Sequence, residues 1–113
     1  MASDKPRKWT FFSNHAHVLV VLSRTPDILI RDLAWEVGIT ERAASSILAD
    51  LEEEAYLTRI REGRTNRYVL NRSRPLRHPL EQHRKIGDVL ALVSNDEAAG
   101  EVQRRSSPRT RTA

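Results

Sequence analysis

The fold is decided by residues 30–70, which read IRDLAWEVGITERAASSILADLEEEAYLTRIREGRTNRYVL. Two helical patterns, at residues 31–37 and 41–54, flank the turn Gly-Ile-Thr at 38–40. Glycine is favoured just past a helix C-terminus and threonine just before a helix N-terminus. Two helices joined by a short glycine-containing turn are typical of a helix-turn-helix. Their inward residues recur at spacings of three and four, namely Leu33, Ala34 and Val37, then Ala44, Ile47, Leu48 and Leu51.

Two β-type runs follow these helices, at residues 57–61 and 67–70. The five residues between them, 62–66, contain the turn formers Gly63 and Asn66. We therefore expect a β-hairpin with arginines around its tip. Side chains expected to reach the core from the hairpin are Leu57, Tyr68 and Leu70.

Upstream, residues 14–24 predict a further helix, with Ser13 as its N-cap and Pro26 beyond its end. Its expected apolar stripe consists of Ala16, Leu19, Val20 and Ser23, widened by Val18 and Leu22. Residues 28–30, Ile-Leu-Ile, are too few for a helix and predict a short strand.

The remaining segments complete the predicted organisation. Residues 1–9 are expected to be a disordered basic arm, 10–74 the main domain, and 95–113 a disordered tail. Residues 75–94 are expected to hold a linker and a last helix over 80–94. The apolar stripe of this helix could pack on the first helix or on the same helix of a second copy. We favour the second arrangement, a homodimer through Ile86, Val89, Leu90 and Val93.

Composition and charge narrow the function classes. The 113 residues suit one domain with a formal net charge of +4, which favours a nucleic-acid partner. The stretch 57–74 carries six arginines against Glu62, and the preceding stretch 50–54 carries four acidic residues. Without cysteine there is no disulfide framework and no thiolate metal site. No apolar run is long enough to cross a bilayer, so we expect a cytoplasmic, nucleoid-associated protein.

The motifs LAxxVGITERA, ILADLEE, AYLTR and GRTNRY stand in this order and resemble the winged helix-turn-helix domain of MarR-like and ArsR-like regulators. The resemblance covers about residues 12–70. It implies a mainly α fold with a small β-hairpin (α+β) and binding of double-stranded DNA. This sequence departs from the pattern at Ala55, where glycine is common, and in having a single helix after the hairpin, which argues against a ligand pocket.

Carried over position by position, the resemblance assigns a DNA-binding surface. The start of the recognition helix would be Thr40, Glu41, Arg42, Ala43, Ser45 and Ser46, and the wing tip would be Arg64, Thr65, Asn66 and Arg67. Arg31 would meet a phosphate. Arg42 is the candidate for guanine, and Glu41 either accepts from a cytosine amino group or serves the helix dipole. Ala43 and Ser46 are small, so base readout would be sparse.

The expected function is a sequence-specific, double-stranded DNA-binding transcriptional regulator, acting as a repressor. Its recognition helix would lie in the major groove and its arginine-tipped wing on the backbone or in the minor groove. The alternative is a winged-helix adaptor that binds protein without specific DNA binding. Trp35 is expected to be exposed on the second helix, where it could mark a partner surface or lie under the N-terminal arm or Trp9. An RNA-binding function would need a stacking platform of exposed aromatic residues, which the sequence does not show.

Enzyme, cofactor and metal functions are not expected. The sequence contains no nucleophile elbow, phosphate loop or metal-binding helix signature. The four histidines, His15, His17, His78 and His83, are not spaced as a compact ligand set. A sensing role for any of them stays open, as do the operator, the effector and the regulated genes.

Overall fold

A computed structural model describes residues 9–94 of the chain. The predicted basic arm, apart from Trp9, and the predicted tail lie outside these residues. The described chain divides after Asn71 into two compact units. We call residues 9–71 the winged unit and residues 72–94 the C-terminal unit, and describe each by itself.

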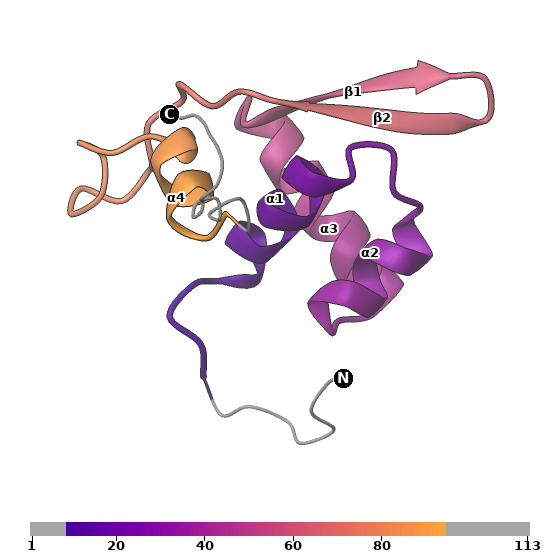
Figure 1. Cartoon of the computed structure of the whole chain (residues 1–113), viewed down its shortest axis with the longest axis horizontal. Helices are drawn as coiled ribbons and strands as arrows, with labels where there is room; N and C mark the ends of the chain where they lie inside the picture. Colours follow the sequence, from indigo (N-terminus) through magenta and orange to yellow (C-terminus); the bar gives the residue numbers. More distant parts are fainter. Residues whose placement is uncertain (1–8, 95–113) are drawn as a thin grey trace, which may run out of the picture. The chain divides into compact units, whose positions relative to one another are not determined.

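Three helices form the body of the winged unit: α1 (Asn14–Arg24), α2 (Ile30–Val37) and α3 (Glu41–Glu53). Each contacts the other two (Figure 1). Ser13 caps α1 as predicted, and its side chain accepts a hydrogen bond from the Ala16 N–H at 3.3 Å. Gly38 ends α2 in the left-handed conformation, at φ +87°, where glycine carries no Cβ penalty.

The core of the winged unit lies between the three helices and one face of the hairpin. Val18, Leu22 and Leu33 are its most deeply buried large side chains. The apolar stripe of α1 is shifted from the prediction, because Val21 is buried while Ala16, Val20 and Ser23 are half-buried. The four inward residues predicted for α3 are all buried, namely Ala44, Ile47, Leu48 and Leu51.

The short strand predicted at residues 28–30 is wrong. Ile30 is already the first residue of α2, and Leu29 is its extended N-cap, at φ −73° and ψ 149°. A strand needs a ladder of backbone partners, and the described sheet consists of the hairpin alone. Two backbone hydrogen bonds hold the loop instead: the Tyr68 N–H donates to the Pro26 carbonyl at 2.9 Å, and the Ile28 N–H donates to the Thr25 carbonyl at 3.2 Å.

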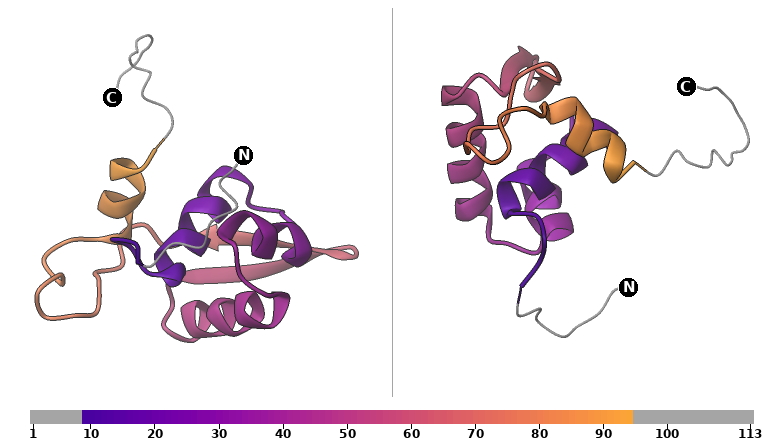
Figure 2. Two further views of the ribbon diagram at one scale, coloured as in Figure 1. Left: turned by 90° about the horizontal axis from the view of Figure 1, so that it is seen from below. Right: turned by 90° about the vertical axis from the view of Figure 1, so that its left-hand side faces the viewer.

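The hairpin is tighter than predicted. β1 (Leu57–Glu62) and β2 (Thr65–Leu70) pair antiparallel from Leu57↔Leu70 to Glu62↔Thr65, so only Gly63 and Arg64 form the turn. Leu57 and Tyr68 are buried as expected, whereas Leu70 is half-buried. The element order helix, helix, turn, helix, hairpin is that of a winged helix-turn-helix, with the hairpin as its wing. Two views show the hairpin extending beyond the helices on the side where α2 lies (Figures 1 and 2).

In the C-terminal unit the last helix is shorter than predicted. α4 spans Ile86–Leu92, and residues 80–85 form turns instead of the first half of a helix. Backbone hydrogen bonds fix these turns: the Glu81 N–H donates to the His78 carbonyl and the Arg84 N–H to the Glu81 carbonyl, both at 2.8 Å. None of the helices in residues 9–94 has the length and apolar character needed to cross a bilayer.

The burial of α4 changes the dimerisation prediction. Ile86 and Leu90 are already buried in the single chain, and Val89 and Val93 are half-buried. The predicted stripe is therefore not free as a whole to meet a second copy. The exposed large apolar side chain of α4 is that of Leu92, at 74%.

Candidate nucleic-acid interface

The first turn of α3 is fixed by its cap. The Thr40 hydroxyl accepts a hydrogen bond from the Ala43 N–H at 3.0 Å, and the Thr40 carbonyl accepts from the Ala44 N–H at 2.9 Å. Glu41 stands in the first turn, where a negative charge is favoured by the helix dipole. The direction in which the following side chains leave the helix is thus set by a cap and by the buried Ala44.

The outward face of α3 carries one long polar side chain near its start. Arg42 is exposed, and its exposed neighbours on this face, Ser45, Ser46 and Ala49, are all small. Side chains this short let the helix backbone approach another surface closely. A helix of this kind fits a DNA major groove, where an arginine can bond the O6 and N7 atoms of guanine.

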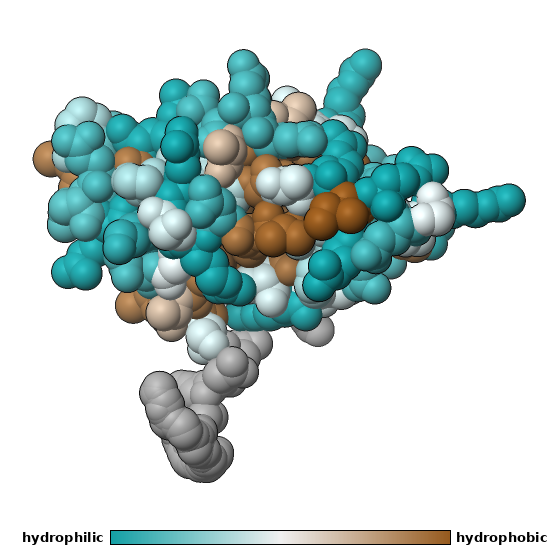
Figure 3. Space-filling model, turned by 90° about the horizontal axis from the view of Figure 1, so that it is seen from above, coloured by the Kyte–Doolittle hydropathy of each residue, from teal (hydrophilic) through white to brown (hydrophobic). Residues whose placement is uncertain are grey.

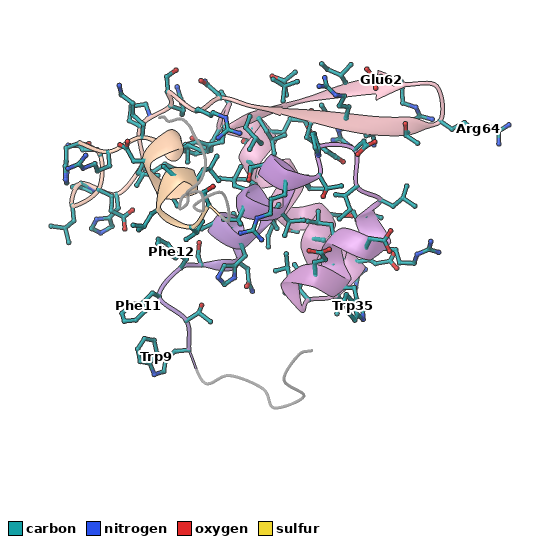
Figure 4. The ribbon with its side chains drawn as sticks, in the orientation of Figure 1. Trp9, Phe11, Phe12, Trp35, Glu62 and Arg64 are labelled. Atoms are coloured by element: carbon teal, nitrogen blue, oxygen red, sulfur yellow. The ribbon has the colours of Figure 1, made fainter. Side chains whose placement is uncertain are left out.

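The turn of the wing projects Arg64. Gly63 has φ +64°, and Arg64 is not among the residues with positive φ, which is the pattern of a type II′ turn. The Arg61 Nε donates to the Gly63 carbonyl at 2.8 Å and the Thr65 hydroxyl donates to the Glu62 carbonyl at 3.1 Å. These two bonds support the turn, while the Arg64 side chain extends away from the hairpin (Figure 4).

The register gives the two faces of the wing different characters. Arg67 stands opposite Ile60 on the outward face, together with Thr58 and Val69. Ile60 and Val69 are 39% and 43% exposed. A view onto this face shows hydrophobic atoms bordered by hydrophilic ones (Figure 3). Asn66 pairs with Arg61 on the inward face and is half-buried, so it does not stand at the tip as predicted.

Arg59 is committed to a partner within the winged unit. Its Nη2 donates to Glu52 Oε1 of α3 at 2.6 Å. This hydrogen bond, together with the negative charge of Glu52, raises the pKa of Arg59 against the opposing effect of partial burial. Arg59 therefore belongs to the hairpin's attachment to α3 and adds no free charge to the wing.

The link between α3 and β1 contains a left-handed residue that is not glycine. Ala55 has φ +64°, which lies in the left-handed region that favours glycine. Around it the Tyr56 N–H donates to the Leu51 carbonyl at 2.9 Å and the Ala55 N–H to the Glu52 carbonyl at 3.1 Å. The first of these bonds closes α3 in the manner of a Schellman motif. This short link positions the wing directly after α3.

On α2, two exposed residues stand one helical turn apart. Arg31 is the second residue of the helix, with its Nε 3.9 Å from Asp32 Oδ1, a distance too long for a hydrogen bond. Trp35 is 82% exposed, as the sequence predicts, and projects from α2 on the part of the winged unit away from the hairpin (Figure 4).

Three of the four histidines have polar partners of their own. No group of three metal-ligating side chains occurs within residues 9–94. His15 Nε2 lies 2.9 Å from Asp50 Oδ2, which joins α1 to α3. His17 Nδ1 lies 3.3 Å from Asn14 Oδ1, and His78 Nδ1 accepts from the Leu80 N–H at 3.0 Å.

The structure thus places most of the predicted site residues at the surface of one compact unit. Ala43 and Asn66 are half-buried, and the exposed set is Arg31, Thr40, Glu41, Arg42, Ser45, Ser46, Arg64, Thr65 and Arg67. The sequence interpretation missed the pairing of Glu52 with Arg59. Strand alternation could have found it, because Arg59 lies two residues after the inward-facing Leu57.

Comparison with known proteins gives a similar solved structure, that of the "PcaV transcriptional regulator from Streptomyces coelicolor in complex with its natural ligand". The alignment covers 81% of this chain and 70% of that chain, with 22% sequence identity and a TM-score of 0.49. No protein-family model and no curated protein matches the chain. The winged helix-turn-helix assignment rests on the element order, register and burial of this chain itself.

Proposed function

We propose that the chain is a sequence-specific, double-stranded DNA-binding transcriptional regulator that acts as a repressor. The observation that carries the proposal is the pairing, within one compact unit, of a capped α3 that exposes Arg42 with a hairpin whose turn exposes Arg64. In this proposal α3 enters the major groove and the wing lies on the backbone or in the minor groove.

The charges near α3 support a defined orientation on the duplex. Arg42 stands at the start of the outward face, while the exposed Glu53 stands at the end of α3. Phosphates would repel the acidic end. The start of α3 would therefore enter the groove, with Arg31 at the beginning of α2 available to a flanking phosphate.

The test is selection of binding sites from a pool of random duplex DNA, followed by fluorescence anisotropy with the selected duplex and a scrambled one. We expect Arg42→Ala to reduce discrimination between the two, by about 1–3 kcal/mol if the arginine bonds a guanine in bidentate fashion. Arg64→Ala and Arg67→Ala should weaken binding to both duplexes equally and lower the salt dependence by about 0.9 for each phosphate that the arginine neutralises. Failure of the unmodified chain to enrich or bind any duplex would refute the proposal.

A homodimer through the C-terminal unit belongs to the same proposal. Its contact cannot use Ile86 and Leu90 without rearrangement, since they are buried. The surface that remains comprises Leu92 with the half-buried Val89 and Val93. A two-fold dimer would place two recognition helices about 34 Å apart and select a palindromic site.

The second candidate function is a protein-binding adaptor, and the exposure of Trp35 favours it. A tryptophan that is 82% exposed can anchor a protein interface. The arginine at the turn of the wing argues for DNA instead. An adaptor would show no salt-dependent binding to duplex DNA in the anisotropy measurement.

A further inference from the structure

Positive charge is distributed unevenly between the two units. Residues 9–71, the winged unit, hold seven arginines and nine acidic residues, a formal net charge of −2. Residues 72–94, the C-terminal unit, hold four arginines and Lys85 against Glu81 and Asp88, a net charge of +3. All five basic residues lie in residues 72–85, a segment with a net charge of +4. We call this second segment the basic loop. The winged unit taken alone does not supply the excess positive charge that attracts a polyanion.

The basic loop has a defined backbone structure. The Gly87 N–H donates to the Arg72 carbonyl at 2.8 Å, the Ile86 N–H to the Arg74 carbonyl at 3.0 Å, and the Leu76 N–H to the Arg84 carbonyl at 2.9 Å. These bonds, with the antiparallel bridge of Pro75 to Lys85, hold the two arms of the loop side by side.

Gly87 lies where the two arms of the loop approach closely. A Cβ atom at Gly87 would lie 3.1 Å from the Arg72 carbonyl oxygen, which is tighter than an ordinary contact. Residues distant in sequence, such as Arg72 and Arg84, are therefore brought onto neighbouring arms of one loop.

Some charges of the loop are not neutralised within the part of the chain that the structure describes. Arg72, Arg84 and Lys85 are exposed, and none of them takes part in an ion pair among residues 9–94. Arg59 of the wing, by contrast, is paired with Glu52 at 2.6 Å. Like charges held on neighbouring arms repel each other, and a polyanion bound across them relieves that repulsion.

We propose that the basic loop is a second contact surface for the phosphate backbone of duplex DNA. The inference rests on the proposed function, because it takes the partner of the winged unit as the partner of the loop. Phosphate contacts of this kind carry no base information and contribute affinity for any sequence. The loop begins at the residue after the winged unit, so both surfaces are carried into the complex by one chain and reinforce each other.

The experiment compares the full-length chain with two triple variants by anisotropy on a labelled duplex over a series of KCl concentrations. The first variant, Arg72→Gln, Arg84→Gln and Lys85→Gln, removes three charges. The second, Arg72→Lys, Arg84→Lys and Lys85→Arg, keeps them. We expect the first to lower the slope of log Kd against log salt by about 0.9 for each phosphate that is no longer neutralised, and the second to leave it unchanged. Discrimination between selected and scrambled duplexes should stay the same in both variants.

The outcomes separate this inference from the proposed function. If the unmodified chain binds duplex DNA and the glutamine variant keeps its salt slope, the basic loop is not a DNA contact. A glutamine variant that loses more affinity for single-stranded RNA than for duplex DNA would overturn the choice of partner. A chain in which Arg42→Ala and Arg64→Ala change nothing, while the loop variant lowers the slope, contradicts the proposed function and leaves the loop as a DNA contact. Circular dichroism of each variant confirms that it is folded.

Discussion

Arg59 of β1 reaches back to Glu52 of α3, with 2.6 Å between Nη2 and Oε1. The two side chains remain 42% and 39% exposed, so the pair contributes only about 0.2–1 kcal/mol to stability. The pair also fastens the base of the wing to α3 and leaves one arginine fewer available to a ligand.

The first prediction concerns this pair. Arg59→Gln should leave the salt dependence of DNA binding unchanged, because its charge is already used by Glu52. Arg64→Gln, the matched control at the turn, should lower the slope by about 0.9. A double-mutant cycle with Glu52→Gln, followed by urea unfolding, should give a coupling energy of about 0.2–1 kcal/mol. Equal slopes for Arg59→Gln and Arg64→Gln, both lowered, would show that Arg59 touches DNA.

The second prediction concerns the left-handed Ala55. Because an L-residue with a Cβ pays about 1–2 kcal/mol in this conformation, Ala55→Gly should stabilise the protein, by about 1 kcal/mol after the extra entropy of unfolded glycine is counted. The converse change, Gly38→Ala, should destabilise the protein by about 1 kcal/mol, because φ there is +87°. No atom lies within 4 Å of an added Cβ, so this cost comes from the backbone conformation and not from a steric clash. Urea unfolding measures both. Destabilisation by Ala55→Gly would contradict this prediction, because it would mean that the alanine methyl group contributes more to the free energy of unfolding than the backbone strain removes.

The third prediction concerns the cap of α3. Thr40→Ala removes the hydroxyl that accepts from the Ala43 N–H and should cost about 1 kcal/mol of unfolding free energy. Thr40→Ser keeps the hydroxyl and should cost much less. Thermal unfolding of the two variants side by side provides the measurement, and an equal loss in both would assign the effect to the threonine methyl group instead of the cap.

The fourth prediction concerns self-association. If α4 meets a second copy through its exposed apolar side chain, Leu92→Glu should convert a dimer into a monomer, because the charge would have to be buried in the contact. Leu29→Glu, at a 48% exposed leucine of the winged unit, is the control and should leave the dimer intact. Light scattering on the full-length chain distinguishes the two states. An unmodified chain that scatters as a monomer would exclude the dimer from the proposed function.

The sequence was most informative where the signal is local. The caps Ser13 and Thr40 and the αL glycine Gly38 were confirmed, and the bounds of α1 agree with the prediction. Capping residues and three-to-four periodicity act within one or two helical turns, so they can be interpreted without knowing the fold. The buried stripe of α3 can be predicted in this way, and it determines which residues, including Arg42, lie on the outward face.

The hairpin shows where a local signal becomes ambiguous. Several residues between 62 and 66 favour turns, and the sequence alone does not say which two close the loop. The register decides it, because Leu57 and Leu70 pair across the base and leave only Gly63 and Arg64 unpaired. Register depends on which strand face is buried, which is a property of the packed molecule.

The C-terminal unit shows where the signal is non-local. Residues 80–85 fit a helical pattern, yet they form part of a loop whose arms bond across more than seven positions, as between Leu76 and Arg84. Such pairing leaves no periodicity in the sequence. The predicted strand at residues 28–30 failed for a related reason, since β-branched residues indicate extension only where a neighbouring strand is present.

Under the proposed function, the small side chains on the outward face of α3 have a consequence in the cell. With Ser45, Ser46 and Ala49 offering few groups to base edges, each half-site would be defined by few base pairs. A genome contains very many near matches to such a short recognition sequence, and these sites compete for the protein. Occupancy of a true operator would then depend strongly on the number of protein molecules in each cell. Modest changes in the expression of the protein would therefore change the regulation of its target.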